Sequence, residues 1–266
     1  MTSHLLRNLA PISDAGWEAI ESDVKPRLTT YLAARKLVDF DGPHGWSHSA
    51  TNLGRVASVA PISPALQANR RRVLPLVELR APFTVSRREL EDVDRGAKDP
   101  DFANLDLAAR QIAQGETVAV LHGYPAAGIK GVTESASHEP IAFASDLERY
   151  PTSVARAVDV LRQAGIGGPY GLALAPTVYT TIIETTERGG HLLVDHLRQI
   201  LGGPVVWAPG VDGGVVLSVR GGDFVLECGQ DISIGYINHD AEVVQLYLEE
   251  SLNFRVLEPD AAVALT

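Results

Sequence analysis

The sequence predicts an α+β protein that carries a long extended arm. Helical and extended segments are mixed without a regular strand–helix–strand alternation, and the last third of the 266 residues is rich in strands. From Ser47 to about Leu79 the chain shows no helical period and no apolar core of its own. A two-stranded arm is only marginally stable alone, so we expect it to lie on a neighbouring subunit.

The first predicted helix covers residues 13–36. Ser13 or Asp14 can cap it, and apolar residues from Trp17 to Leu32 recur at steps of three or four. Pro26 lies inside this pattern and predicts either a kink or two shorter helices. A segment dense in turn formers follows this helix and leads into the arm.

Two strands, 53–59 and 73–79, are predicted within the arm. Ser86 and Glu89 have the spacing of a capping box at the start of a short helix over 86–95. A longer helix over 101–122 turns one apolar face inward, made of Leu105, Ala108, Ala109, Ile112, Ala119 and Val120.

The remaining elements alternate irregularly. Helices are predicted over 151–164, 177–186 and 191–201, the second opened by Pro176. Strands are predicted over 170–175, 205–208, 215–219, 224–228, 232–236, 243–248 and 254–257. We expect strands 205–208 and 215–219 to pair with each other.

Composition excludes several classes of function. Lys and Arg total 23 against 33 Asp and Glu, and this net charge of −10 argues against broad binding to nucleic acid or anionic membranes. The single cysteine, Cys228, cannot form an internal disulfide. The first residues lack the apolar core of a signal peptide, and no run is long enough for a membrane span. We expect a cytoplasmic protein.

No motif predicts catalysis or a metal site. The glycines of residues 165–171 lie between a helix and a strand, the reverse of a dinucleotide-binding loop. The sequence contains no GxSxG nucleophile motif, and its histidines lack zinc-ligand spacing. Arg70, Arg71 and Arg72 in the arm favour salt bridges between subunits. The residues alone therefore predict a structural or assembly protein, not an enzyme.

Short motifs in a fixed order then suggest a family. The strongest is Arg220-Gly221-Gly222-Asp223-Phe224, and the others lie at residues 9–11, 42–46, 75–80, 83–84, 95–96, 167–170 and 229–236. In their order and spacing the chain resembles the encapsulins, the shell proteins of bacterial nanocompartments. The resemblance implies a phage-capsid-like fold of the Hong Kong 97 type.

That resemblance also implies a division of the chain and an assembly. The peripheral domain would comprise residues 1–43, 81–130 and 220–266, the extended loop 44–80, and the axial domain 131–219. About sixty copies would form a closed icosahedral shell in which every interface repeats. The resemblance points one loop at the fivefold pore, made of Glu187, Arg188, Gly189, Gly190 and His191.

Encapsulins enclose a cargo enzyme, commonly a dye-decolourising peroxidase or a ferritin-like protein, which they recognise by its C-terminal peptide. Carried over, the family groove would be lined by Leu28, Arg35, Leu37, Asp39, Asp231, Ile232 and Ile234. Some relatives stack a tryptophan on a bound flavin, and because Arg88 holds that position here we expect neither flavin nor another cofactor. A phage major capsid protein and a bacteriocin- or protease-type hydrolase are the alternatives.

Overall fold

The computed structural model describes residues 4–143, 149–186, 190 and 192–266. Its first helix, α1 (Asp14–Tyr31), begins at Ser13, whose Oγ accepts a hydrogen bond from the Gly16 amide at 3.0 Å. The helix continues through Pro26, so one helix and not two covers this segment, and it ends five residues before the predicted boundary. Short 3-10 turns occur at Arg7–Leu9, Ala34–Lys36, Pro125–Ala127 and Pro259–Ala261.

One sheet is built around the long strand β10 (Val243–Val256). β10 pairs antiparallel with β4 (Val77–Ser86) on one side, and with β9 (Ser233–His239) and β8 (Phe224–Cys228) in succession on the other. β1 (Asp39–Asp41) adds to β8 in parallel. The two strands predicted over 243–248 and 254–257 are therefore one, because a single strand serves both β9 and β8.

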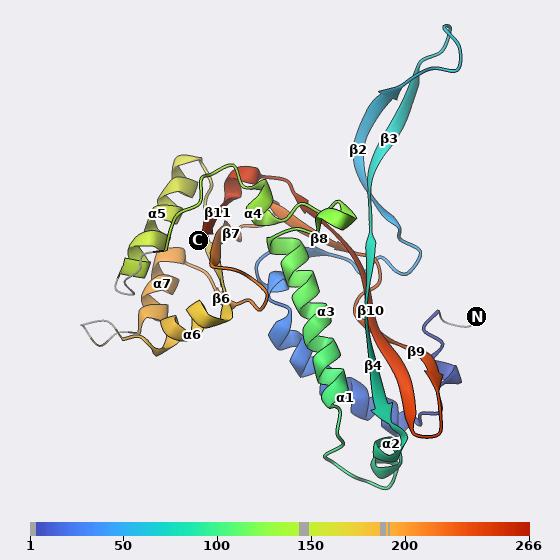
Figure 1. Ribbon diagram of the computed structural model, residues 1–266. Coiled ribbons are helices and arrows are strands. Elements are labelled where there is room, and N and C mark those ends of the chain that lie inside the picture. The colour runs from blue at the N-terminus through green and yellow to red at the C-terminus, as the bar shows by residue number, and fades with distance from the viewer. Residues whose placement is uncertain (1–3, 144–148, 187–189, 191) are drawn as a thin grey trace.

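Helices cover this sheet. The long helix α3 (Ala103–Leu121) packs on β4 and β10, and α1 packs on α3 (Figure 1). All six residues predicted for the inner face of α3 are buried. The short helix α2 (Arg87–Asp94) starts after Ser86, but the predicted capping box is wrong: the Ser86 hydroxyl makes no cap bond, and Glu89 instead accepts from the Asp101 amide at 2.9 Å.

A second sheet has the order β11-β7-β5-β6. The fully buried β5 (Tyr170–Leu174) lies between β6 (Val205–Trp207) and β7 (Gly214–Ser218), so the prediction that these two outer strands pair with each other is wrong. β11 (Ala262–Leu265) pairs with β7, although the sequence-based division places residues 220–266 in the peripheral domain. Nearby lie the helices α4 (Val132–Ser135), α5 (Tyr150–Gln163), α6 (Pro176–Glu184) and α7 (Leu193–Leu201).

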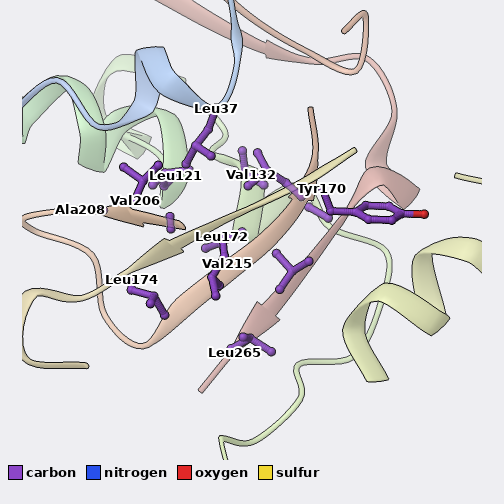
Figure 2. Close-up of a cluster of buried hydrophobic side chains, with 14 of the residues drawn as sticks. Leu37, Leu121, Val132, Tyr170, Leu172, Leu174, Val206, Ala208, Val215 and Leu265 are labelled. Carbon is purple, nitrogen blue, oxygen red and sulfur yellow. The ribbon is translucent and has the colours of Figure 1, made fainter. Parts of the chain in front are cut away.

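Large aliphatic side chains fill the space around this second sheet. Figure 2 shows Leu172 and Leu174 of β5 together with Val215 of β7 and Leu265 of β11. Leu37, which follows the 3-10 turn after α1, enters the same cluster. The segment between α1 and β1 thus ties the two sheets together.

The arm is a separate two-stranded sheet that projects from the body (Figure 1). β2 (Ala50–Val59) and β3 (Ala68–Pro75) pair antiparallel from Ala50↔Pro75 outward to Val59↔Ala68. After Pro75 the chain enters β4 and rejoins the first sheet. None of the helices in the described part of the chain is long and apolar enough to cross a membrane.

Candidate functional site

The arm exposes apolar side chains that its own subunit does not cover. Val56 is 60% exposed, Ile62 97% and Leu66 55%. Its charged residues are all cations, Arg55 in β2 and Arg70–Arg72 in β3, and residues 44–77 contain no Asp or Glu. Both outer strand edges present unpaired backbone groups, which favour pairing with another chain. The arm therefore has the chemistry of an interface between subunits.

The base of the arm is fixed to the first sheet. The Gly45 amide donates to the Gly229 carbonyl at 2.7 Å, and His48 Nε2 lies 2.7 Å from Glu227 Oε1. His4 stacks on Trp46 with 3.9 Å between ring centroids. These contacts hold the root in place and set the direction in which the free strands project.

A groove of about 460 Å³ lies between α1 and the segment that leads into β9. Val24, Leu28 and Leu32 form its helical wall, at the spacing of one helix face. Ile232 and Ile234 form the opposite wall. Ile232 is half-buried, whereas Ile234 is only 5% exposed and belongs to the core below. An extended peptide with apolar side chains fits a groove of this kind.

The structure brings five of the seven predicted groove residues together. Leu28, Arg35, Asp231, Ile232 and Ile234 all line the cavity. The other two lie elsewhere.

Leu37 and Asp39 lie outside the groove. Leu37 is 3% exposed and points into the core of the second sheet (Figure 2). Asp39 Oδ2 accepts a hydrogen bond from the Gly222 amide at 2.5 Å and so holds the turn before β8. Both residues, which the family resemblance placed in the groove, follow the turn that carries the chain away from α1.

Arg35 is a structural anchor at one end of the groove. Its Nε donates to Glu116 Oε2 at 2.7 Å, and its Nη1 to Asp231 Oδ1 at 2.8 Å. Burial alone would lower the pKa of Arg35, but the charges of Glu116 and Asp231 hold it above its ordinary value. The guanidinium at this end of the predicted groove is therefore committed to carboxylates of its own chain.

The sequence analysis missed the N-terminal residues that close one side of the groove. The Tyr236 amide donates to the Leu5 carbonyl at 2.9 Å, which places Leu5 along the edge of β9. Arg7 pairs with Glu21 at 2.6 Å, and its guanidinium lies 4.1 Å from the centroid of the Trp17 ring. No local pattern signals these contacts, because they join residues far apart in sequence.

The predicted pore loop links α6 to α7. Glu187, Arg188, Gly189 and His191 lie outside the described residues. Gly190 is exposed and has a φ of +81°, a conformation that favours glycine. Thr186 and Leu192 form a β-bridge, so the two described ends of the loop lie side by side.

The described part of the chain shows neither a metal-ligand cluster nor a reactive cysteine. There, no three His, Cys, Asp or Glu side chains gather as a metal site requires. Burial, together with the charge of Asp231, raises the pKa of the Cys228 thiol to about 12, so this thiol is a poor nucleophile at neutral pH.

Comparison with known proteins agrees with this geometry. The family model described as "Encapsulating protein for peroxidase" matches residues 1–253. A Type 1 encapsulin shell protein of Rhodospirillum rubrum is 47% identical over 267 residues, covering 98% of this chain and 95% of that protein. A ferritin-like–encapsulin shell fusion protein of Pyrococcus furiosus is 25% identical over 72% of this chain and 52% of its own length.

Solved structures share the fold. A virus-like particle from Pyrococcus furiosus superposes with a TM-score of 0.67 at 18% identity, covering 94% of this chain and 99% of that one. A structure of Mycobacterium phage Cain matches with a TM-score of 0.53 at 14% identity, covering 89% and 90%. The fold is therefore the phage-capsid fold of the Hong Kong 97 type, as predicted.

The full-length sequence match to a shell protein, together with the capsid fold and its projecting arm, decides between the classes left open by the sequence. The relatives are shell proteins and not hydrolases, and the phage capsid structure is similar in fold alone. The chain belongs to the encapsulin family of nanocompartment shell proteins.

Proposed function

We propose that this chain is the protomer of a closed cytoplasmic shell of about sixty copies that encloses a cargo enzyme. The arm carries the proposal, because β2 and β3 have free edges and exposed apolar side chains that only another subunit can cover. Electron microscopy of the purified protein tests it. Closed particles of uniform size support the proposal, and isolated protomers at micromolar concentration contradict it.

The two sheets and the arm would correspond to the three parts of a shell protomer. The first sheet with α1 and α3 would form the peripheral domain, the hairpin at 44–80 the extended loop, and the second sheet most of the axial domain at the fivefold vertex. Because stability gained at the interfaces adds to that of the protomer, folding and assembly would be linked.

The groove between α1 and β9 would bind the C-terminal peptide of the cargo. Val24, Leu28 and Ile232 offer apolar contact, which is the main source of affinity for a short peptide. Lys25 and the Arg7–Glu21 pair lie at the rim, where charge can set the direction of the peptide. The name of the family model supports a peroxidase as cargo, and the fusion relative supports a ferritin-like protein.

We expect no flavin on this shell. Arg88, which lies where some relatives carry a stacking tryptophan, is exposed on α2. A guanidinium can stack on a flat ring but offers no aromatic surface of its own. Purified particles should therefore lack the visible absorbance of a flavin.

The loop between α6 and α7 would line the fivefold pore. Five copies of Glu187, Arg188 and His191 around one axis would set a local potential that selects small ions. Replacing residues 187–191 with a two-residue Gly-Ser linker is expected to widen the pore and speed the entry of terbium into intact particles. A linker of five Gly and Ser residues is the control for length, and equal rates in all three proteins would show that this loop does not control entry.

A further inference from the structure

A cluster of buried charge lies beneath one end of the groove. Glu116 of α3 and Glu250 of β10 have fully buried side chains, and Arg35 reaches them from the turn after α1. Asp231, before β9, completes the cluster, and its side chain is 42% exposed toward the groove. Three carboxyl groups thus share one guanidinium.

Arg35 binds the three carboxyl groups unequally. It binds Glu116 through both Nε and Nη2, at 2.7 and 2.6 Å, and Asp231 through Nη1 at 2.8 Å. Glu250 is reached only at 3.3 Å. Glu116 Oε1 and Glu250 Oε1 are buried without a hydrogen-bond partner among the described residues. Glu250 is therefore the least compensated anion of the three.

The charge balance requires a proton. With all groups ionised the cluster would carry a net charge of −2, and an uncompensated charge is far more costly to bury than a neutral acid. The Cys228 thiol also lies near the cluster, and with a pKa of about 12 it is uncharged at neutral pH. A proton on Glu250 removes one charge and lets Glu250 donate to Glu116, as carboxyl pairs do when they share a site.

We propose that Glu116 and Glu250 share one proton at neutral pH, held on Glu250, and that this proton keeps the floor of the groove closed. The link to the groove is Asp231, whose Oδ1 accepts both from Arg35 and from the Ile232 amide at 2.8 Å. When Glu250 ionises, its carboxylate competes with Asp231 for Arg35 and repels the Asp231 carboxylate. Asp231 is the carboxylate with access to solvent, so it is the one that moves, together with Ile232.

The pH dependence has a definite sign. Burial raises the pKa of Glu250 well above its ordinary value, and the charge of Glu116 raises it further, while Arg35 opposes both. The folded chain then holds a proton that the unfolded chain has lost above pH of about 4.3. The stabilisation that this proton provides is complete below that pH. Above it, the folding equilibrium constant falls by up to about tenfold per pH unit, until the pH passes the raised pKa of Glu250.

Infrared spectroscopy of intact particles tests where the proton lies. A protonated carboxylic acid has a carbonyl stretch separate from that of carboxylates, and we expect this band at pH 7 in the wild type and its loss in Glu250→Gln. Glu249→Gln is the matched control: Glu249 is also fully buried on β10, but Arg80 at 2.6 Å compensates its charge, and His4 Nε2 lies 3.2 Å from its other oxygen. The control should keep the band.

A band that is absent from the wild type, or that survives in Glu250→Gln, would overturn the shared proton. If Glu250→Gln does not assemble, Glu116→Gln replaces it, because it too leaves a single buried carboxylate for Arg35 and should also abolish the band.

The single cysteine reports the closure. Cys228 is 1% exposed beside the cluster, so a maleimide reaches it only when the packing around the cluster opens. At alkaline pH we expect several-fold slower labelling of Glu250→Gln than of wild-type particles, because the neutral amide cannot repel Asp231. Removing the charge of Glu250 would by itself lower the thiol pKa and speed labelling, so the two effects have opposite signs. Equal or faster labelling of the variant would overturn the closed floor.

Discussion

Replacing residues 53–72 with a two-residue Asn-Gly turn is expected to abolish the closed shell and leave soluble or aggregating protomers. Asn52 and Val73 face each other in the hairpin, so the turn joins two strands that are already paired and leaves the root intact. The apolar side chains removed with the two strands, such as Val56 and Val59, are exposed on their own subunit. Their loss therefore costs interface stability and not the fold of the protomer.

Size-exclusion chromatography measures this outcome, and circular dichroism checks that the protomer keeps its secondary structure. The matched control replaces only residues 60–67 with the same turn, which preserves the pairing of Val59 with Ala68 and both full strand edges. This control is expected to close into particles. Particles formed by the 53–72 replacement would show that the arm is not needed for closure.

The substitution Ile232→Asp is expected to empty the shell of its cargo while leaving the shell itself assembled. Ile232 is half-buried in the wall of the groove, next to the Asp231 carboxylate, so a peptide that covers this position would bury the new charge against apolar side chains. Burying an unpaired charge costs several kcal/mol, and each 1.4 kcal/mol is about tenfold in affinity. Cargo per particle should fall by about a hundredfold or more.

Co-purification of the native cargo with mutant particles gives the readout, as the ratio of cargo to shell protein on a denaturing gel. Ile237→Asp is the control, because Ile237 lies on β9, five residues after Ile232, but is 47% exposed and does not line the groove. Normal loading of Ile232→Asp would refute the groove as the cargo site. Particles that fail to form would show that Ile232 belongs to the core.

Much of the fold was predictable because it is encoded locally. The apolar face of α3 and the Pro176 start of α6 are spacings within one element, and the structure confirms them. The arm was predictable for the opposite reason, since residues 50–75 lack any pattern that could bury them in their own subunit. Family resemblance added the capsid fold, which composition and periodicity alone do not specify.

Pairings between distant strands were not predictable from local patterns. β5 inserts between β6 and β7, and β11 joins their sheet from the far end of the chain, because long-range packing decides strand order. The same limit affected the groove, where Leu37 and Asp39 follow a turn whose direction depends on the second sheet. Sequence neighbours of a site are not always its members.

The buried cluster carried a signal that the sequence analysis did not use. Glu116 falls one turn after Ile112 on the apolar face of α3, a position where an acid is costly unless it is paired. Glu249 and Glu250 are adjacent in β10 and directly follow the apolar run Leu246-Tyr247-Leu248. A charged residue on a predicted core face predicts a partner of opposite charge, and Arg35 is that partner.

Native mass spectrometry of the purified, intact protein tests the central claim most directly. About sixty copies of a 28.5-kDa chain give an empty shell of about 1.7 MDa, and enclosed cargo adds to that mass in whole copies. We expect a megadalton species that loses its cargo in Ile232→Asp and is absent when residues 53–72 are replaced. Detection of the wild-type protein as a 28.5-kDa monomer or a small oligomer at micromolar concentration would contradict the account.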